Sequence, residues 1–211
     1  TGTDSWTGTG ADEKLIVNAN GVIQATDTFD GAGGTDTIQL TGNNVSADFS
    51  VATLSNFEAV SFTNTTGTNV ATFNASQFGG TGISNTLAVT GAAGIQQIII
   101  NNASNFDASG WTLTTWSSTD KIIINGTTGA DTIKGTALLS FGDLMVGGDG
   151  GDSYTVNNSF DKITELSTDT GTDTINSTAG SFNMATNAAN VENIVLGVGA
   201  FSATGNASDN S

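Results

Sequence analysis

One run of nine residues carries the groups with the clearest chemistry. Residues 147–155, GGDGGDSYT, follow the pattern G-G-x-G-x-D-x-U-x, in which U is a large apolar residue. The glycines permit positive φ and close backbone approach, so their carbonyl groups can turn toward one cation. Aspartate adds a charged, hard oxygen ligand of the kind that calcium prefers. The pattern therefore predicts a calcium-binding turn that leads into a short strand.

Looser copies of the same turn occur elsewhere in the chain. Residues 34–38, 129–133 and 171–175 share the core Gly-x-Asp-Thr-Ile, and four related turns argue against coincidence. A fifth copy, at residues 7–12, keeps the glycines and the aspartate, but Lys14 stands where the apolar residue should be. The alternative is that these are ordinary turns between strands, which favour Gly, Asn and Asp with or without a metal.

These turns resemble the repeat of the RTX proteins, a calcium-binding parallel β-solenoid signature. The resemblance covers both ends of the chain, whereas residues 63–116 lack the aspartate turns. It implies coils of about 18 residues with ions between stacked turns. It also implies export of the unfolded chain through a type I secretion channel, followed by folding on calcium outside the cell.

The spacing of the aspartates predicts which turns stack. Asp12 and Asp30, like Asp131 and Asp149, are separated by one such coil, while Asp131, Asp152 and Asp173 follow at a regular, slightly longer interval. We therefore expect three calcium sites: Asp131/Asp149/Asp152, Asp152/Asp169/Asp173 and, at the N-terminal end, Asp12/Asp30/Asp36. The turn glycines expected to contribute are Gly147, Gly150, Gly171 and Gly33.

A longer block is also repeated. Residues 34–62 and 171–196 each contain GTDTI followed by an Asn-x-Glu sequence, which places Glu58 and Glu192 at equivalent positions. Such a block often follows the repeat in proteins of the RTX type. Since a repeated residue is more often structural than catalytic, we expect both glutamates to serve the fold.

The elements that must position these turns are short strands. Pieces rich in Ile, Val, Thr and Phe, such as 37–40, 96–100, 121–124 and 153–156, are separated by Gly, Asn, Ser or Asp, and such residues suit a pleated surface. The aspartate register favours a parallel β-solenoid, a β-roll or β-helix with calcium-binding Gly/Asp turns, over a sandwich or barrel. A short helical turn is expected within 49–57 or 75–78, and no long helix.

The motif content divides the chain into three segments of what we expect to be one continuous solenoid. Residues 1–62 hold degenerate coils, 63–120 a motif-poor middle, and 121–211 the calcium-binding coils. In the middle segment, apolar and asparagine ladders would have to join the coils in place of calcium. Residues 203–210 resemble the start of another repeat, so we expect the chain to be part of a longer protein.

Composition excludes several function classes. Twenty acidic residues face four lysines, which gives a net charge of −16, and this charge opposes compaction unless cations neutralise it. Nucleic-acid binding needs basic residues for the phosphates and is not expected. No apolar run is long enough for a membrane span. The absence of cysteine excludes disulfides, and the absence of histidine and cysteine removes the common nucleophile arrangements and the usual zinc ligands.

The sequence therefore predicts a calcium-binding structural segment of a secreted bacterial surface protein, of S-layer or adhesin type, that is not an enzyme. Calcium ions are the expected partners. The chain is also expected to self-associate or to bind a cell-surface polysaccharide. The alternative is a polysaccharide-binding module of a secreted RTX-type protein or hydrolase, in which an exposed tryptophan such as Trp6 stacks on sugar. One of Trp111 and Trp116, which bracket a strand, is expected in the core.

Overall fold

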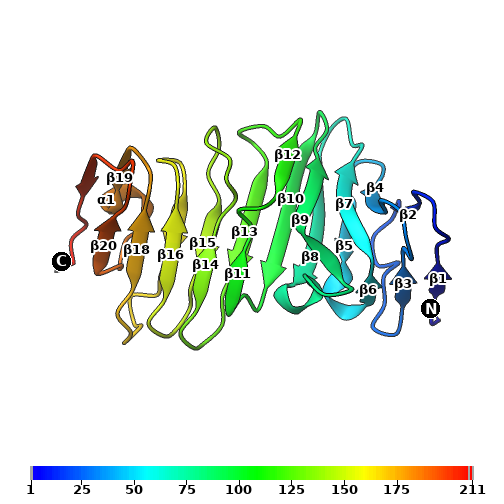
Figure 1. Cartoon of the computed structure of the whole chain (residues 1–211), viewed down its shortest axis with the longest axis horizontal. Coiled ribbons are helices and arrows are strands. Elements are labelled where there is room, and N and C mark those ends of the chain that lie inside the picture. The colour runs from blue at the N-terminus through cyan, green and yellow to red at the C-terminus, as the bar shows by residue number, and fades with distance from the viewer. Residues whose placement is uncertain (1, 209, 211) are drawn as a thin grey trace. The chain divides into compact units, whose positions relative to one another are not determined.

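The structure, a computed structural model, describes residues 2–208 and residue 210; Asp209, which falls in the expected further repeat, lies outside them. The chain forms two compact units, one with the residues up to Ile99 and Gly110–Asp120, the other with Ile100–Ser109 and the residues from Lys121 onward. Each unit is a parallel β-solenoid, in which a strand pairs with the equivalent strand of the next coil (Figure 1). The predicted all-β solenoid class is confirmed.

A coil of the first unit contains up to three strands, and the strands of successive coils build three parallel sheets. The first sheet contains β1 (Ser5–Thr7), β3 (Thr28–Asp30) and β6 (Thr53–Ser55). The second runs in the spatial order β12 (Thr112–Thr114), β9 (Ile83–Thr90), β7 (Phe57–Phe62), β4 (Thr37–Leu40), β2 (Lys14–Val17). In the third, β8 (Thr68–Asn74) lies between β5 (Ser46–Asp48) and β10 (Ile95–Asn101).

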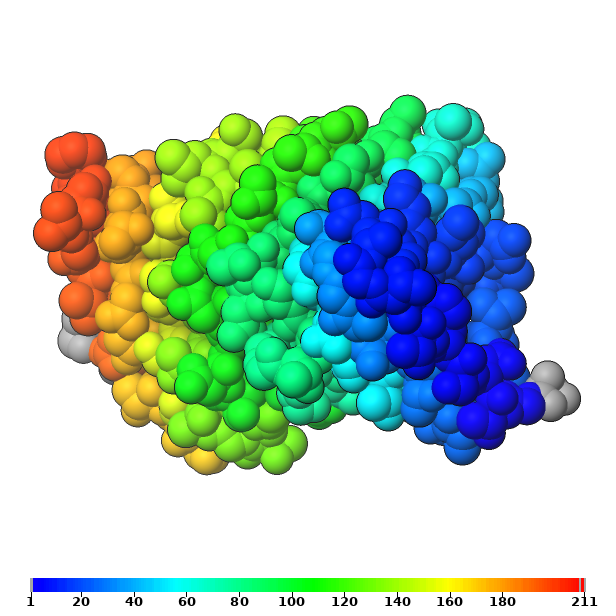
Figure 2. Space-filling view, turned by 45° about the vertical axis from the view of Figure 1, so that its right-hand side comes forward, coloured from blue at the N-terminus to red at the C-terminus, as the bar shows by residue number. Residues whose placement is uncertain are grey.

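The second unit has shorter coils, because two sheets account for most of its strands. One sheet runs in the order β11 (Asn105–Asp107), β14 (Thr132–Lys134), β16 (Ser153–Val156), β18 (Thr174–Ser177), β20 (Asn193–Leu196). The other contains β13 (Lys121–Asn125), β15 (Leu144–Val146) and β17 (Lys162–Thr164). A short pair is formed by β19 (Ser181–Asn183) and β21 (Ser202–Thr204). In Figure 2 successive coils of this unit form neighbouring bands of the surface.

Alternation of side chains fills the core. In β8 and β10 every second residue is buried, as expected for a strand with one face toward the interior. Residues of one inward column lie directly over one another: Ile133, Tyr154 and Ile175 are register partners and are all fully buried. The inward columns of successive coils therefore form one continuous core within each unit.

The register confirms one spacing of the aspartates. Thr132 pairs with Ser153 and Ser153 with Thr174. The aspartates directly before these residues, Asp131, Asp152 and Asp173, therefore stack on one another, and each is joined to the next at an interval of 21 residues.

The register corrects the other spacing. We expected Asp12 and Asp30, and likewise Asp131 and Asp149, to be separated by one coil. The pairing of the strands shows that this interpretation is wrong. In the first unit Ser5 pairs with Thr28, so the coil that contains β1 and β2 is 23 residues long. A coil of 18 residues does occur, but it joins Asp143 to Asp161, where β15 pairs with β17.

Buried amides join the coils of the motif-poor middle, as expected. The backbone N–H of Val45 donates to Asn69 Oδ1 at 2.8 Å, and Gln96 Nε2 donates to Asn64 Oδ1 at 3.1 Å. Both expected helical turns form, as 3-10 helices η1 (Phe49–Val51) and η2 (Ala75–Gln77). One further turn, α1 (Met184–Asn187), was not expected. None of the helices in the described part of the chain is long and apolar enough to cross a membrane.

Candidate metal centre

Buried aspartates enter the solenoid at one kind of position. Eight of the described aspartates are buried, and each stands two residues before a buried apolar residue. Residues i and i+2 of a strand share a face, so each carboxylate points to the interior just before the first inward apolar side chain of its strand. The pairs are Asp27/Phe29, Asp36/Ile38, Asp120/Ile122, Asp131/Ile133, Asp143/Met145, Asp152/Tyr154, Asp161/Ile163 and Asp173/Ile175.

In the second unit these carboxylates form a ladder. The backbone N–H of Asp131 donates to Asp152 Oδ1 at 2.8 Å, and that of Asp152 donates to Asp173 Oδ1 at 2.8 Å. The N–H of Asp173 then donates to Glu192 Oε2 at 2.9 Å. Hydrogen bonds of a buried N–H to a charged acceptor are stronger than neutral ones. The carboxylates of Asp152, Asp173 and Glu192 thus tie their coils to the preceding coil through hydrogen bonds alone.

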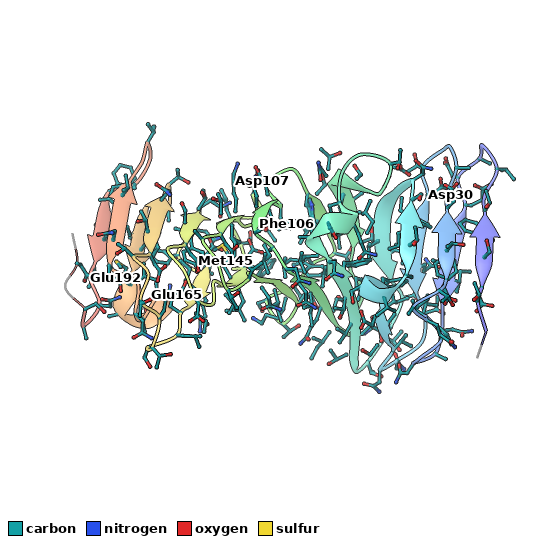
Figure 3. The ribbon with its side chains drawn as sticks, turned by 90° about the horizontal axis from the view of Figure 1, so that it is seen from below. Asp30, Phe106, Asp107, Met145, Glu165 and Glu192 are labelled. Carbon is teal, nitrogen blue, oxygen red and sulfur yellow. The ribbon has the colours of Figure 1, made fainter. Side chains whose placement is uncertain are left out.

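The first unit has the same ladder with different members. The N–H of Glu13 donates to Asp36 Oδ1 and that of Asp36 to Glu58 Oε2, both at 2.8 Å. Glu58 and Glu192 therefore accept the same bond at the same place in their repeats, which confirms their equivalence and their structural role. Figure 3 marks Asp30 in this unit, and Glu165 and Glu192 in the second.

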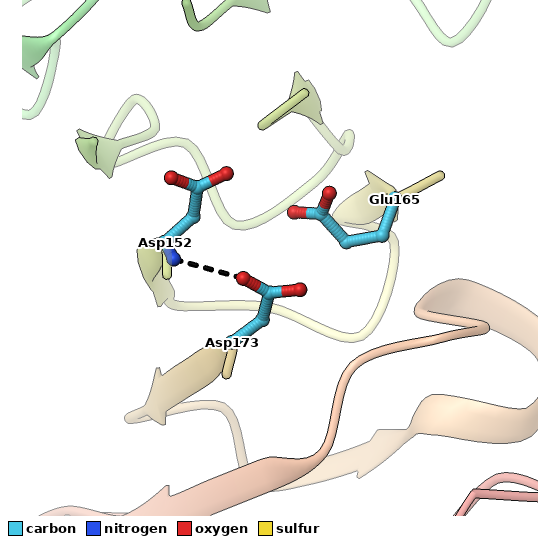
Figure 4. A group of neighbouring side chains, drawn as sticks. All are labelled: Asp152, Glu165 and Asp173. Atoms are coloured by element: carbon cyan, nitrogen blue, oxygen red, sulfur yellow. Dashed lines mark hydrogen bonds between the residues drawn. The ribbon is translucent and has the colours of Figure 1, made fainter. Parts of the chain in front are cut away.

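One group of side chains goes beyond the ladder. Carboxylate oxygens of Asp152, Glu165 and Asp173 all lie within 4.8 Å of one another, and no other such group of three occurs among the described residues. The turn before β16 supplies Asp152, the turn before β18 supplies Asp173, and Glu165 follows the end of β17. Their exposed fractions are only 1%, 6% and 1%. Figure 4 shows the Glu165 carboxylate extended toward the other two.

The oxygen atoms of this cluster are incompletely paired. Glu165 Oε1 accepts a hydrogen bond from the hydroxyl of Tyr154, which also lies 3.4 Å from Asp152 Oδ2. Glu165 Oε2 is buried and has no hydrogen-bond partner among the described residues. Burial of an unpaired carboxylate oxygen is costly, so this atom is the one at which a further group is needed.

Mutual repulsion and burial shift the pKa values of all three acids upward. Burial, with the charges of Asp173 and Asp152, raises the pKa of Glu165 to about 8. Burial also raises the pKa of Asp173 to about 6, with contributions from the charges of Asp169 and Asp152. The pKa of Asp152 is raised, first by burial. Three ionised carboxylates in this place are therefore unfavourable unless a cation balances them.

The donor set is suited to a hard cation. It consists of carboxylate oxygens beside a phenol oxygen, whereas the chain has no histidine or cysteine to attract softer metals. Comparison with protein-family models, curated proteins and solved structures finds no match to the chain. Function is therefore inferred from the chemistry of this cluster and from the repeat.

Gly147 marks how tightly the cluster is packed. A Cβ on this residue would collide with Tyr154 Oη, Asp152 Oδ2 and Glu165 Oε1. We expect Gly147→Ala to lower the free energy of unfolding by about 3 kcal/mol, the upper end of overpacking costs, both with calcium and with a chelator. Urea unfolding measures this.

The control for that substitution is Gly129→Ala. A Cβ on Gly129 has its nearest neighbour, Thr127 Oγ1, at 3.9 Å, so this variant should unfold like the parent protein. Equal stability of the two variants would show that the space beside Gly147 is not restricted.

The sequence-predicted residues of the second unit are only partly brought together. Asp152 and Asp173 join the cluster, and Gly147 borders it. Asp131 belongs to the ladder, and its Oδ1 accepts from Thr127 Oγ1 at 2.8 Å. Asp149 is exposed and lies in the same turn as Asp152. The trio Asp131/Asp149/Asp152 is therefore not assembled in the structure.

Asp169 takes a supporting place beside the cluster. Its Oδ1 accepts the N–H groups of Gly150 at 3.0 Å and Gly171 at 3.1 Å, and these bonds lower its pKa. The φ of Gly150 is +120°, a value that L side chains rarely adopt. Asp169 and the two glycines thus hold neighbouring turns together, while Glu165 occupies the position in the cluster that was expected for Asp169.

The N-terminal trio is not assembled either. Asp12 is exposed and accepts the N–H of Thr35 at 2.7 Å, and Asp30 accepts Asn56 Nδ2 at 2.7 Å. Gly33 donates its N–H to Thr9 O. Asp36 alone enters the ladder, opposite Glu13.

Glu13 takes the place that was expected for Asp12. Glu13 Oε2 and Asp36 Oδ2 are both buried, and neither has a hydrogen-bond partner within the described part of the chain. A cation in this unit would therefore meet Glu13 beside Asp36.

A second buried acidic pair was missed from the sequence. Asp143 donates its N–H to Asp161 Oδ1 at 3.0 Å, and Thr136 donates its N–H to Asp143 Oδ2 at 2.6 Å. Burial, followed by the charge of Asp161, raises the pKa of Asp143 to about 7. The sequence does contain a signal for this pair. Each aspartate stands two residues before an apolar residue, and the two aspartates are 18 residues apart. Neither aspartate has a glycine two residues before it, as the Gly-x-Asp motif requires.

The three tryptophans pack on phenylalanine rings of the first unit. Trp111 is buried and stacks on Phe78, which confirms that one of the two tryptophans beside β12 is core. Trp116 lies against Phe62. Trp6 stacks on Phe57 and lines a groove of about 270 Å³. Trp6 and Trp116 are both half-buried, so sugar stacking of the kind expected for a polysaccharide-binding module would use these two residues.

Proposed function

We propose that the chain is a calcium-binding structural segment of a secreted bacterial surface protein of the RTX type, in an S-layer or an adhesin. The observation that carries the proposal is the buried, unpartnered Oε2 of Glu165 beside Asp152 and Asp173 in the described structure. These three carboxylates would hold the ion, and the ion would supply the positive charge that balances them.

The chemistry of the cluster favours calcium over other cations. Calcium accepts six to eight oxygen ligands in irregular geometry, whereas magnesium demands a near-octahedral shell and gives up its water reluctantly. The cluster lies in turns where backbone carbonyls are abundant and is nearly closed to solvent. A large cation that loses its water readily suits it best.

The charge of the whole chain gives the ion a role in folding. A net charge of −16 destabilises the compact state, and a site that exists only in the folded chain turns binding energy into folding energy. In the cytosol, where free calcium is scarce, the folded state is less stable and the chain opens more readily for export; outside, calcium stabilises the closed coils. The absence of cysteine and the abundance of Thr, Asn, Ser and Gly are consistent with this route.

Thermal unfolding with and without calcium tests the proposal. We expect about 5 mM calcium to raise the melting temperature by about 5–10 °C over that in chelator, because ligand at about a hundred times its Kd contributes about 2.7 kcal/mol. Far-UV circular dichroism should show strand content falling when calcium is removed. Magnesium at the same concentration should give a much smaller rise.

Two results would contradict it. One is a chain that is fully folded in chelator with an unchanged melting temperature in calcium. The other is an equal response to magnesium and calcium, which would indicate general screening of the charge.

A further inference from the structure

Tyr154 carries a hydroxyl in a column of otherwise apolar side chains, Phe106, Ile133, Ile175 and Ile194. Its register partners are Ile133 in one neighbouring coil and Ile175 in the other, and all three are fully buried. Packing at this position therefore requires an apolar side chain and no hydroxyl. Tyr154 is also the chain's one tyrosine.

The hydroxyl of Tyr154 reaches the acidic cluster. It donates to Glu165 Oε1 and lies 3.4 Å from Asp152 Oδ2. The collision of a Cβ on Gly147 with Tyr154 Oη, Asp152 Oδ2 and Glu165 Oε1 shows that these three oxygens gather around one point. A buried hydroxyl needs a partner to offset its desolvation, and the cluster supplies that partner.

A second observation separates the cluster from a mere gathering of acids. Glu165 has an exposed fraction of only 6%, and its Oε2 is without a partner in the described structure although Oε1 is held by Tyr154. The hydroxyl carries a single proton, so it can satisfy one carboxylate oxygen and no more. Its own lone pairs stay available as acceptors.

We propose that Tyr154 is part of the cation site: its hydroxyl positions Glu165, and its phenol oxygen is the fourth side-chain oxygen presented to the ion. This inference rests on the calcium function proposed above and adds a residue to it. Without the ion, the hydroxyl proton points to Glu165 Oε1. With the ion, the oxygen lone pairs face the cation, while Asp152, Glu165 and Asp173 provide the charge.

Tyr154→Phe removes the hydroxyl oxygen and keeps the ring, so it tests the role of the oxygen alone. Phenylalanine keeps the aromatic packing of the column, so folding in calcium should be retained. Calcium affinity, measured by calorimetry on the whole chain, should fall by about 10-fold, the lower end of effects seen when a group that orients metal ligands is removed. Tyr154→Ile, which copies the neighbouring coils, should show a similar loss of affinity.

A spectroscopic measurement follows Tyr154 itself during the titration. Because Tyr154 is the chain's one tyrosine and the three tryptophans absorb in the same region, the difference spectrum between the parent and Tyr154→Phe isolates the tyrosine band. Calcium titration should shift this band in step with the heat of binding, and the shift should vanish in Tyr154→Phe. A purely structural tyrosine would not follow the titration in this way.

The outcomes separate the two proposals. Calcium binding without a tyrosine shift, together with equal affinity of Tyr154→Phe and the parent, would overturn the role of Tyr154 and leave the calcium function standing. Absence of calcium binding in the parent would overturn both.

Discussion

Replacing Glu165 by glutamine is expected to abolish most of the calcium response while leaving the calcium-free protein as stable as the parent. Burial raises the pKa of Glu165 to about 8, so in the empty site this side chain is largely protonated at neutral pH. Glutamine has nearly the same shape and is also uncharged. It removes little from the empty site, but it withdraws one of three charges from the cation.

The size of the effect follows from ligand charge. Calcium affinity depends strongly on the number of charged ligands, and we expect the Kd to rise by roughly 100-fold. At the calcium concentration that saturates the parent, this loss corresponds to about 2.7 kcal/mol and to about 5–10 °C in melting temperature. Melting curves of both proteins in chelator and in calcium measure it.

Glu58→Gln is the matched control. Glu58 accepts the N–H of Asp36 in the first unit, as Glu192 accepts that of Asp173 in the second, and it has no place in the cluster. Its substitution should lower stability by similar amounts with and without calcium. If Glu165→Gln keeps the full calcium response of the parent, the ion binds elsewhere.

The fold could be predicted because it repeats. The regular interval between Asp131, Asp152 and Asp173 is the coil itself, since the strands that follow them pair in that register. A periodic chain thus reveals its architecture even where single turns are degenerate. The amide ladders of the middle segment follow from the same geometry, because a coil without charged turns must still satisfy its buried N–H groups.

The composition of the site could be predicted only in part, because the motif describes turns one at a time. Glu165 enters the cluster from the end of β17, and no glycine pattern announces it. Its position depends on the shorter coil between β15 and β17. In the first unit the acid that lies beside Asp36 is Glu13, whereas the motif indicated the adjacent residue Asp12. In a strand, a shift by one residue decides between the interior and solvent.

A simpler signal than the glycine motif was available. Aspartate two residues before an inward apolar residue marks every buried aspartate of the described chain, including Asp143 and Asp161. At six of these eight positions the carboxylate accepts an N–H of the preceding coil, as Asp161 does for Asp143. Asp131 and Asp143 instead accept the N–H of a threonine in their own coil. Glycine is required where the backbone takes a positive φ, as at Gly150, or where a Cβ would collide, as at Gly147. The aspartate and the glycine coincide in some turns and not in others.

Without calcium, the protein is expected to become more stable as the pH falls from about 8 to about 5, the reverse of ordinary acid denaturation. The pKa values of Glu165, Asp143 and Asp173 rise to about 8, 7 and 6 in the folded chain, chiefly through burial. In the unfolded chain these groups return to ordinary pKa values near about 4. Between these limits the folded state binds more protons than the unfolded state.

The direction of the change in stability with pH follows from this difference in bound protons. Stability decreases with pH wherever the folded state holds more protons, so the contribution of these acids is fully present below about pH 4 and is lost as the pH rises to about 8. A difference of one pKa unit is equivalent to about 1.4 kcal/mol. We expect a gain of at least about 2 kcal/mol between the two ends, or about 5 °C in melting temperature. Asp169, whose pKa is lowered by the Gly150 N–H, opposes the trend only below this range.

Calcium should reverse the pH dependence of stability that arises from the cluster. It should leave the pH dependence that arises from Asp143 and Asp161 unchanged. Protons and the ion compete for Asp152, Glu165 and Asp173, so the stabilisation by calcium should be large at about pH 8 and small at about pH 5. Asp143 and Asp161 lie outside the cluster, and their share of the slope should persist in saturating calcium. Melting temperatures at several pH values, with chelator and with calcium, measure both effects. A calcium-free protein that loses stability steadily on acidification would show that its buried acids are already ionised without a cation, and the electrostatic reason for a bound ion would then be lost.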